Sequence, residues 1–194
     1  MYPSLTWEGR ETENSVYLTF DDGPHPLITP WVLNQLDRFD FKATFFCIGD
    51  NIRKYPEIYK QILDRGHQTG NHTFNHLSGF KTSNDKYLEN IAKCAELVKN
   101  KLFRPPYGHI KSSQILHLKP NYQIVMWSLL VEDWNPKLDR LCKLDLLKKL
   151  TRKGDIIVFH DSEKAKGNLE YLLPLYLEFL KTEHYKTALL LENE

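Results

Sequence analysis

The sequence of 194 residues lacks several features that define large classes of proteins. It has only three cysteines, Cys47, Cys94 and Cys142, and no CxxC pair, so we expect neither a disulfide framework nor a thiolate zinc site. No apolar run reaches the length of about 20 residues that is needed to span a bilayer. The net charge is only +1, and a nearly neutral chain has no strong field with which to attract nucleic acid or anionic lipid.

The N-terminal segment, residues 1–14, lacks the apolar middle region of a signal peptide. We therefore expect the cell envelope or an extracellular location if the natural N-terminus is longer, and the cytoplasm otherwise. Hydrophobic residues make up 41% and charged residues 26% of the chain, as in globular proteins. The length is that of one domain. We predict a single domain over residues 1–194, with residues 1–15 as an N-terminal extension, and we expect a monomer.

Short apolar runs alternate with amphipathic segments along the whole chain. The predicted strands are 16–20, 42–49, 67–70, 102–104, 122–129, 155–160 and 187–191. The predicted helices span about 30–39 (capped by Thr29), 56–65, 83–101, 144–153 and 169–181 (kinked at Pro174). Strands separated by helices imply parallel pairing in a sheet that is buried on both faces. Because a complete eightfold barrel needs about 250 residues, we predict an open or incomplete α/β barrel.

Polar and aromatic residues gather where the predicted strands end. These residues are Asp21, Asp22, Asp50, His72, His76, Arg104, Tyr107, Asp133, Trp134, His160 and Asp161. In parallel sheets and barrels the active site is built at the carboxyl ends of the strands. The sequence therefore predicts that these segments, which are far apart along the chain, meet in one cleft.

Two short patterns together indicate a metal site. His72 and His76 are spaced i, i+4, which on one helical turn places both imidazoles on the same face. Taken alone the pair also fits ordinary surface residues, and Asp21-Asp22-Gly23-Pro24 also fits an ordinary turn. Two imidazoles and one carboxylate make a three-ligand set with a position left for water, as in catalytic zinc sites.

Hydrolysis at such a site also needs a base and an acid. The second carboxylate of the Asp21–Asp22 pair is placed to take a proton from water. His160, at the end of a distant strand, is the candidate that protonates the leaving group. If it stood alone, His160 would be read as a histidine satisfied by hydrogen bonds at a strand end.

Five ordered motifs resemble those of a known family. They are TFDDGP at 19–24, HTFNH at 72–76, RPPYG at 104–108, EDW at 132–134 and FHD at 159–161. They resemble the motifs of the polysaccharide deacetylases with the NodB homology domain, carbohydrate esterase family 4, and the match runs from about residue 16 to 190. The resemblance implies a distorted, incomplete (β/α) barrel with a mostly parallel sheet surrounded by helices.

The resemblance also implies a role for the residues of the first two motifs and for the start of the third. Asp22, His72 and His76 are expected to bind the metal. Asp21 is expected to act as the general base, and Arg104 to lie against it, keeping it ionised and oriented.

The other motifs are expected to contact the substrate and the leaving group. The backbone N–H of Tyr107 is expected to stabilise the oxyanion, with the loop stiffened by Pro105 and Pro106, the second of which we also place among the substrate-binding residues. Trp134 is expected to form part of the groove wall, and Asp133 to orient His160. Many members of the family carry another aspartate three residues before the Asp-Trp pair, where this chain has Leu130.

The expected reaction is removal of N-acetyl groups from a polysaccharide that contains GlcNAc or MurNAc, such as peptidoglycan, chitin or chito-oligosaccharides, with release of acetate. Zinc is the expected ion, and a site of two histidines and one aspartate also accepts cobalt, nickel or manganese. Two alternatives share the same residues: an esterase that acts on O-acetyl groups of acetylxylan-like glycans, and an inactive carbohydrate-binding homologue. The expected partner is the glycan, with no nucleic acid and no membrane span.

Overall fold

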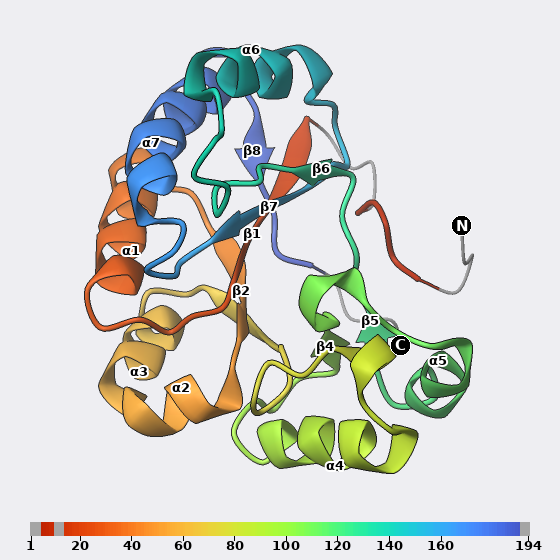
Figure 1. Cartoon of the computed structure of the whole chain (residues 1–194). Helices are drawn as coiled ribbons and strands as arrows, with labels where there is room; N and C mark the ends of the chain where they lie inside the picture. The colour runs from red at the N-terminus through yellow and green to blue at the C-terminus, as the bar shows by residue number, and fades with distance from the viewer. Residues whose placement is uncertain (1–4, 10–13, 191–194) are drawn as a thin grey trace.

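The fold is an alternation of strands and helices, seen in a computed structural model that describes residues 5–9 and 14–190 (Figure 1). The strands are β1 (Ser15–Asp21), β2 (Ala43–Cys47), β3 (Gln68–Asn71), β4 (Leu102–Phe103), β5 (Gln123–Ile124), β6 (Leu129–Leu130), β7 (Ile156–His160) and β8 (Lys186–Thr187). The helices are α1 (Ile28–Phe39), α2 (Gly49–Lys54), α3 (Pro56–Asp64), α4 (Asn84–Ala95), α5 (Ser112–Leu118), α6 (Arg140–Leu150) and α7 (Lys166–Thr182). Two single 3-10 turns, η1 (Gly79–Lys81) and η2 (Pro106–Gly108), lie in the loops.

The strands form one curved parallel sheet in the order β5-β4-β3-β2-β1-β7-β6, and β8 pairs with the start of β1. Among the described residues, β5 and β6 do not pair with each other, so the barrel stays open on one side. This confirms the predicted incomplete α/β barrel. Residues 5–9 lie at this open side, where the backbone N–H of Thr6 donates to Ile124 O at 2.9 Å and Thr6 O accepts from Met126 at 2.7 Å.

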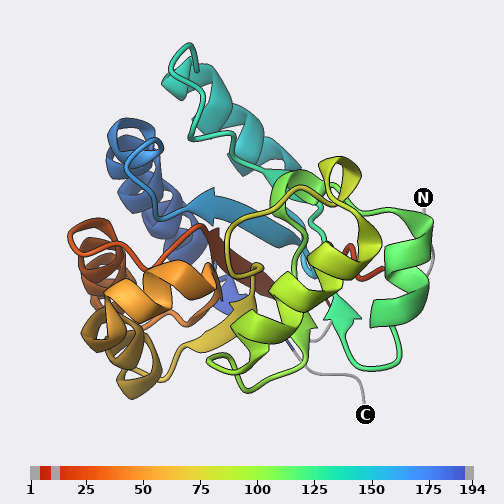
Figure 2. The same cartoon turned by 60° about the horizontal axis from the view of Figure 1, so that its bottom comes forward.

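The helices surround the sheet in a continuous row. Neighbours in this row contact each other in the order α6, α7, α1, α3, α2, α4 and α5. Figures 1 and 2 show α1, α3 and α7 along one side of the sheet and α4 with α5 on another. The strands are therefore buried on both faces, as expected for a parallel sheet whose crossovers are helices.

The side chains of β1, which lies between β2 and β7, alternate between the helices and the inside of the barrel. Leu18 and Phe20 point to the helices, where Phe20 stacks on Phe45 at 5.0 Å and on Phe159 at 5.7 Å. Because side chains alternate along a strand, Thr19 and Asp21 point to the inside of the barrel. Both are buried there, although they are polar. The inner face of β1 therefore requires hydrogen-bond partners, and these are part of the site described below.

Two predicted elements are shorter in the structure. The strand expected over 122–129 is broken between β5 and β6, because Val125 O and Met126 O accept hydrogen bonds from the buried Arg104 side chain. The helix expected over 83–101 ends at Ala95. After it the chain turns into β4, and the Asn100 side chain donates to Thr69 O and accepts from Leu102 N at 3.0 Å.

Three smaller expectations also differ. Thr29 does not cap α1; it lies inside the first turn, and its hydroxyl bonds to Asp161 instead. The short helices α2 and α5 were not predicted. Of the last predicted strand, 187–191, only Thr187 belongs to β8, and residue 191 lies outside the described residues.

Candidate active site

The three predicted metal ligands come together at the carboxyl ends of β1 and β3. Asp22 Oδ1 lies 3.0 Å from His76 Nε2 and 3.7 Å from His72 Nε2. The ligand atoms of all three lie within 4.8 Å of one another. Ligand bonds of about 2.0–2.1 Å around a tetrahedral ion place neighbouring ligand atoms about 3.4 Å apart. The residues present therefore fit a divalent ion with one carboxylate and two imidazole ligands.

The loop that carries the two histidines is not the helical turn that the i, i+4 spacing suggested. Thr73 and His76 both have positive φ angles, 62° and 56°. The loop is held by side chains, because Asn71 Oδ1 accepts from Thr73 N at 2.9 Å and Thr73 Oγ1 accepts from Leu77 N at 3.1 Å. Such side-chain bonds compete with helical backbone bonds, and here they replace them. The helical turn on which the spacing argument relied is absent, whereas the two imidazoles do lie close together, with ring centres 5.1 Å apart.

His72 and Asp22 have the protonation states that a cation requires. The Nδ1 atom of His72 lies 2.8 Å from Arg104 O, so Nδ1 carries the proton and Nε2 is left for a metal. Burial lowers the pKa of His72 to about 4, which makes its neutral form dominant at neutral pH. Burial raises the pKa of Asp22, but its hydrogen bond with His76 and the nearby His160 and His72 outweigh this and hold it well below the usual value.

Asp21, the last residue of β1, faces the same space as the ligands and is held by Arg104. The Asp21 Oδ1 atom accepts a hydrogen bond of 2.8 Å from Arg104 Nη1. Asp21 is 4% exposed and Arg104 is completely buried, so the pair is shielded from water. With Oδ1 fixed, the second carboxylate oxygen is available for a group in the pocket.

Arg104 connects β1, β2 and the segment after β5 inside the barrel. Besides Asp21, its guanidinium donates to Thr19 Oγ1 at 2.7 Å, to Met126 O at 2.9 Å and to Val125 O at 3.3 Å. It also lies 4.1 Å over the centre of the Phe46 ring. Burying a guanidinium is costly unless its donors are satisfied. This set of acceptors explains how an arginine is accommodated in the centre of the barrel.

On β7, in register beside Asp21, His160 is held by Asp133. The His160 Nδ1 atom lies 2.8 Å from Asp133 Oδ1, and the His160 backbone N–H donates to Asp133 Oδ2 at 2.9 Å. Burial would lower the pKa of His160, but Asp133, with Asp21 and Asp22 nearby, raises it to about 9. The imidazole is therefore protonated at neutral pH. The rings of Trp134 and His160 pack edge to face, with their centres 4.7 Å apart.

This chain has Leu130 where many family members have an aspartate. Its Arg104 and His160 nevertheless each have a carboxylate partner, which is Asp21 for Arg104 and Asp133 for His160. Leu130 lines the pocket as an apolar wall.

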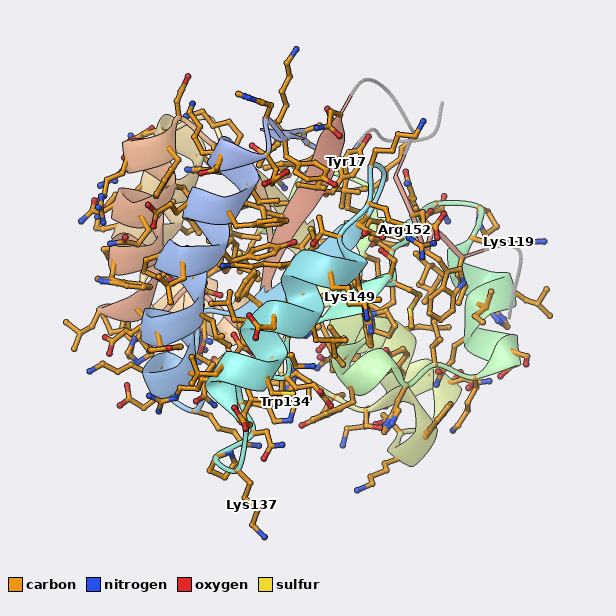
Figure 3. All side chains as sticks on the ribbon, turned by 90° about the horizontal axis from the view of Figure 1, so that it is seen from above. Tyr17, Lys119, Trp134, Lys137, Lys149 and Arg152 are labelled. Atoms are coloured by element: carbon orange, nitrogen blue, oxygen red, sulfur yellow. The ribbon has the colours of Figure 1, made fainter. Side chains whose placement is uncertain are left out.

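The loop from Glu132 to Asp139 that carries Trp134 leads into α6 (Figure 3). Trp134 and Lys137 lie at the end of this helix opposite to Arg152, and Lys137 points away from the molecule.

The metal-ligand candidates, Asp21 and His160 border one cavity of about 460 Å³, whereas Arg104 and Asp133 are not part of its lining. Its lining is Asp21, Asp22, His72, His76, Pro105, Tyr107, Gly108, His109, Trp127, Leu130, Trp134, Val158, His160 and Lys164. Pro106, which we had placed among the substrate-binding residues, is buried behind this wall, and its neighbour Pro105 is in the lining instead. Asp50 also lies elsewhere, in α2, where it pairs with Arg53 and Lys54 at 2.6 Å.

Asp161 is a functional residue to which the sequence assigned no role. It is completely buried, accepts a hydrogen bond of 3.0 Å from Gly23 N and bonds to the Thr29 hydroxyl. A Cβ atom on Gly23 would lie 2.1 Å from Asp161 Oδ2, so only glycine fits there. Asn51 adds a hydrogen bond of 2.8 Å to Asp22 O. Together they fix the turn after β1 that presents Asp22.

Val158 and Lys164 were also missed as pocket residues, and no sequence pattern distinguishes them. Val158 lies within an apolar strand, and Lys164 is one of many exposed lysines. Trp127 and His109 also line the cavity. Within the part of the chain that the structure describes, no helix has the length and apolar character needed to cross a bilayer.

Comparisons with known proteins place this arrangement among related molecules. The family model described as "Polysaccharide deacetylase" matches residues 8–121. A peptidoglycan-N-acetylglucosamine deacetylase of Bacillus cereus is 35% identical over 191 residues, which cover 94% of this chain and 89% of the relative. A chitooligosaccharide deacetylase of Azorhizobium caulinodans is 36% identical over 161 residues, covering 78% and 75%. The crystal structure of the Bc1960 peptidoglycan N-acetylglucosamine deacetylase superposes with a TM-score of 0.89 at 31% identity, over 96% of this chain and 91% of that one.

Proposed function

Since the chain belongs to the polysaccharide deacetylase family, we propose that it is a metal-dependent hydrolase that removes N-acetyl groups from a glycan containing GlcNAc or MurNAc. One observation supports this most directly: Asp21 and His160 border the same cavity as the triad of Asp22, His72 and His76. A base, an acid and a metal-ligand set thus face one space that can hold an acetamido group. The relatives are named for peptidoglycan and chitooligosaccharides, which favours an N-acetyl substrate and the cell wall as its location.

The divalent ion, which we propose to be zinc, with cobalt, nickel or manganese as substitutes, would be held by Asp22, His72 and His76. When bound, it supplies Lewis acidity to the acetyl carbonyl and to the attacking water. Asp21 takes a proton from water as the oxygen bonds to the carbonyl carbon, and Arg104 keeps the carboxylate aligned. The protonated His160 gives its proton to the sugar nitrogen as the C–N bond breaks. Acetate and a free amine result.

Two further residues are proposed to bind the acetyl group and the sugar. The backbone N–H of Tyr107 is proposed to donate to the carbonyl oxygen as negative charge develops there; its φ of 62° places it in a tight left-handed turn beside His76. Trp134, which packs against His160, is proposed to form the apolar wall beside the methyl group. Asp133 accepts a hydrogen bond from His160 Nδ1 and so orients the imidazole with Nε2 towards the pocket.

A substrate panel tests the proposal. We expect the zinc-loaded protein to release acetate from GlcNAc oligomers or peptidoglycan, to release much less from acetylxylan, and to stop when a chelator removes the metal. Acetate is measured enzymatically for each substrate at equal acetyl content. A preference for acetylxylan would instead support the O-acetyl esterase. Binding of glycans without acetate release from any of them would support an inactive carbohydrate-binding homologue, against which the presence of both Asp21 and His160 speaks.

The pH dependence tests the role of Asp133. A general acid works in its protonated form, so a pKa of about 9 for His160 keeps turnover high until the pH rises through that value. Asp133→Asn removes the charge that raises this pKa. We expect the alkaline limb of the pH–kcat profile to move towards the ordinary histidine value of about 6.5, with kcat at pH 8 lowered roughly tenfold or more.

Glu132→Gln is the matched control for this variant, because it removes the neighbouring negative charge from a side chain that is 47% exposed and pairs with Lys143. We expect it to leave the profile in place. An alkaline limb that does not move in Asp133→Asn would contradict the assignment of His160 as the acid tuned by Asp133.

A further inference from the structure

A row of aromatic rings leads from the ligand His76 out of the pocket to the surface. The Tyr107 ring lies 4.6 Å from the His76 ring and 5.7 Å from the His109 ring. Phe80, in η1, stacks on His109 at 4.7 Å with an interplanar angle of 14°. Tyr107 and His109 line the cavity. The row therefore extends the wall of the cavity outward and ends at Phe80.

Two rings of this row, one at its outer end and one beside His76, are exposed to solvent in a way that the rest of the described surface does not repeat. Phe80 is 57% exposed and Tyr107 is 62% exposed. In residues 5–9 and 14–190, every other large hydrophobic residue with comparable exposure is a leucine. Aromatic surface left open beside a concave polar site is a frequent mark of ligand binding.

Hydrogen bonds hold together the two segments that carry Phe80 and His109. Gly79 N donates to His109 O at 3.1 Å, and Ser78 Oγ lies 3.2 Å from His109 Nδ1, so the segments that carry the two rings run side by side (Figure 2). A Cβ atom on Gly79 would lie 2.4 Å from His109 O, so the close approach requires glycine. Gln114 also donates to Gly79 O at 3.1 Å. The rings are thus presented without the ordering cost of a flexible loop.

We propose that Phe80 and His109 form a second carbohydrate subsite, which binds a sugar ring of the same glycan chain beyond the one next to the deacetylated sugar. This inference rests on the proposed function. A pyranose ring has a face of C–H groups, and these pack on the electron-rich face of an aromatic ring while the hydroxyl groups stay in water. Phe80 is separated from His76 by two intervening rings, so it is too remote for the acetyl group at the metal and suits a sugar further along the chain, which a dimer does not reach.

Binding at a remote subsite raises turnover only for substrates long enough to reach it. We expect Phe80→Ala to lower kcat/KM for a GlcNAc tetramer more than for a GlcNAc dimer, so that the tetramer-to-dimer ratio falls roughly tenfold. Phe80→Trp keeps an aromatic face and should restore most of the ratio. Leu116→Ala is the matched control, since it removes an exposed hydrophobic side chain (63%) from nearby α5 without touching the row.

The outcomes separate this inference from the proposed function. An unchanged ratio in Phe80→Ala would overturn the subsite, as would equal losses on both substrates, which indicate a disturbed pocket. If the wild-type protein deacetylates none of the oligomers, turnover gives no ratio, and the proposed function fails if peptidoglycan is not deacetylated either. In that case, calorimetric titration with the tetramer still tests the subsite: binding that is weaker in Phe80→Ala than in Leu116→Ala supports it, and equal or absent binding overturns it.

Discussion

Asp21→Asn is expected to lower kcat by roughly 10³-fold while the protein stays folded and keeps its metal. The asparagine amide cannot take a proton from water, so the base is lost. Its oxygen can still accept the hydrogen bond that Arg104 now donates at 2.8 Å. Because Asp22, His72 and His76 are untouched, metal content should equal that of the wild type.

The choice of asparagine decides what this experiment measures. Asp21→Ala would leave a completely buried guanidinium without its carboxylate, and breaking a buried pair costs about 3–5 kcal/mol of stability. Lost activity would then be confounded with unfolding. Acetate release, metal content by elemental analysis and Tm are therefore measured together on Asp21→Asn.

Asp40→Asn is the matched control for Asp21→Asn. Asp40 is an exposed residue in the left-handed conformation after α1, with a φ of 54°, and asparagine tolerates this conformation. It should behave as the wild type does. Turnover retained in Asp21→Asn within about tenfold, with metal bound, would exclude Asp21 as the base and direct attention to another group in the cavity.

The fold was predictable because an apolar run marks nearly every strand and because the chain is too short for a complete eightfold barrel. The runs around Phe20, Phe45 and Phe159 are apolar and are separated by amphipathic helices, and that pattern allows few arrangements other than a parallel sheet covered by helices. The site was predictable as a set for a related reason: its members follow strands, and parallel strands end at one edge. Neither inference required knowing how any loop turns.

Loop geometry is what the sequence did not reveal. The segment from His72 to His76 has helical spacing, yet backbone N–H groups of this segment and of Leu77 donate to side-chain oxygens of Asn71, Thr73 and Asn90, which fold it into an irregular turn. Arg104 breaks the strand that was expected over 122–129 because its donors need backbone carbonyls from that strand. In both cases a polar side chain competes with regular helix or strand hydrogen bonds for the backbone groups. The pattern of residue types along the sequence does not show which of the two sets of hydrogen bonds forms.

Residues that act through contacts across the chain were also hidden. Asp161 reaches the turn after β1 from the end of β7, 138 residues later, and nothing at position 161 indicates that a buried carboxyl supports Gly23. The exposure of Phe80 is equally invisible, since an aromatic residue in a loop is read as buried by default. These features depend on tertiary packing, and the structure is what adds them to the five motifs.

His72→Ala is expected to lower metal affinity by more than roughly 100-fold. Removing only the hydrogen-bond partner of a metal ligand already lowers affinity roughly 10–100-fold, and this variant removes the ligand itself. Asp22 and His76 alone leave two ligand atoms, 3.0 Å apart, where three are needed for a tight zinc site. The variant should therefore lose its metal on dialysis against a weak chelator and release no acetate. Metal content by elemental analysis and competition with a chromophoric chelator measure this directly.

The control for metal loss is His117→Ala, which removes an exposed histidine of α5 whose Nδ1 lies 2.7 Å from the backbone carbonyl of Ser113. It should retain one equivalent of metal. Burial of His72 adds a second test, because its pKa of about 4 means that little protonation competes with the metal above pH 5. We therefore expect metal affinity in the wild type to be nearly independent of protonation of His72 from pH 5 to 8. Unchanged metal content in His72→Ala would show that the ion is held by other groups and would refute the ligand set.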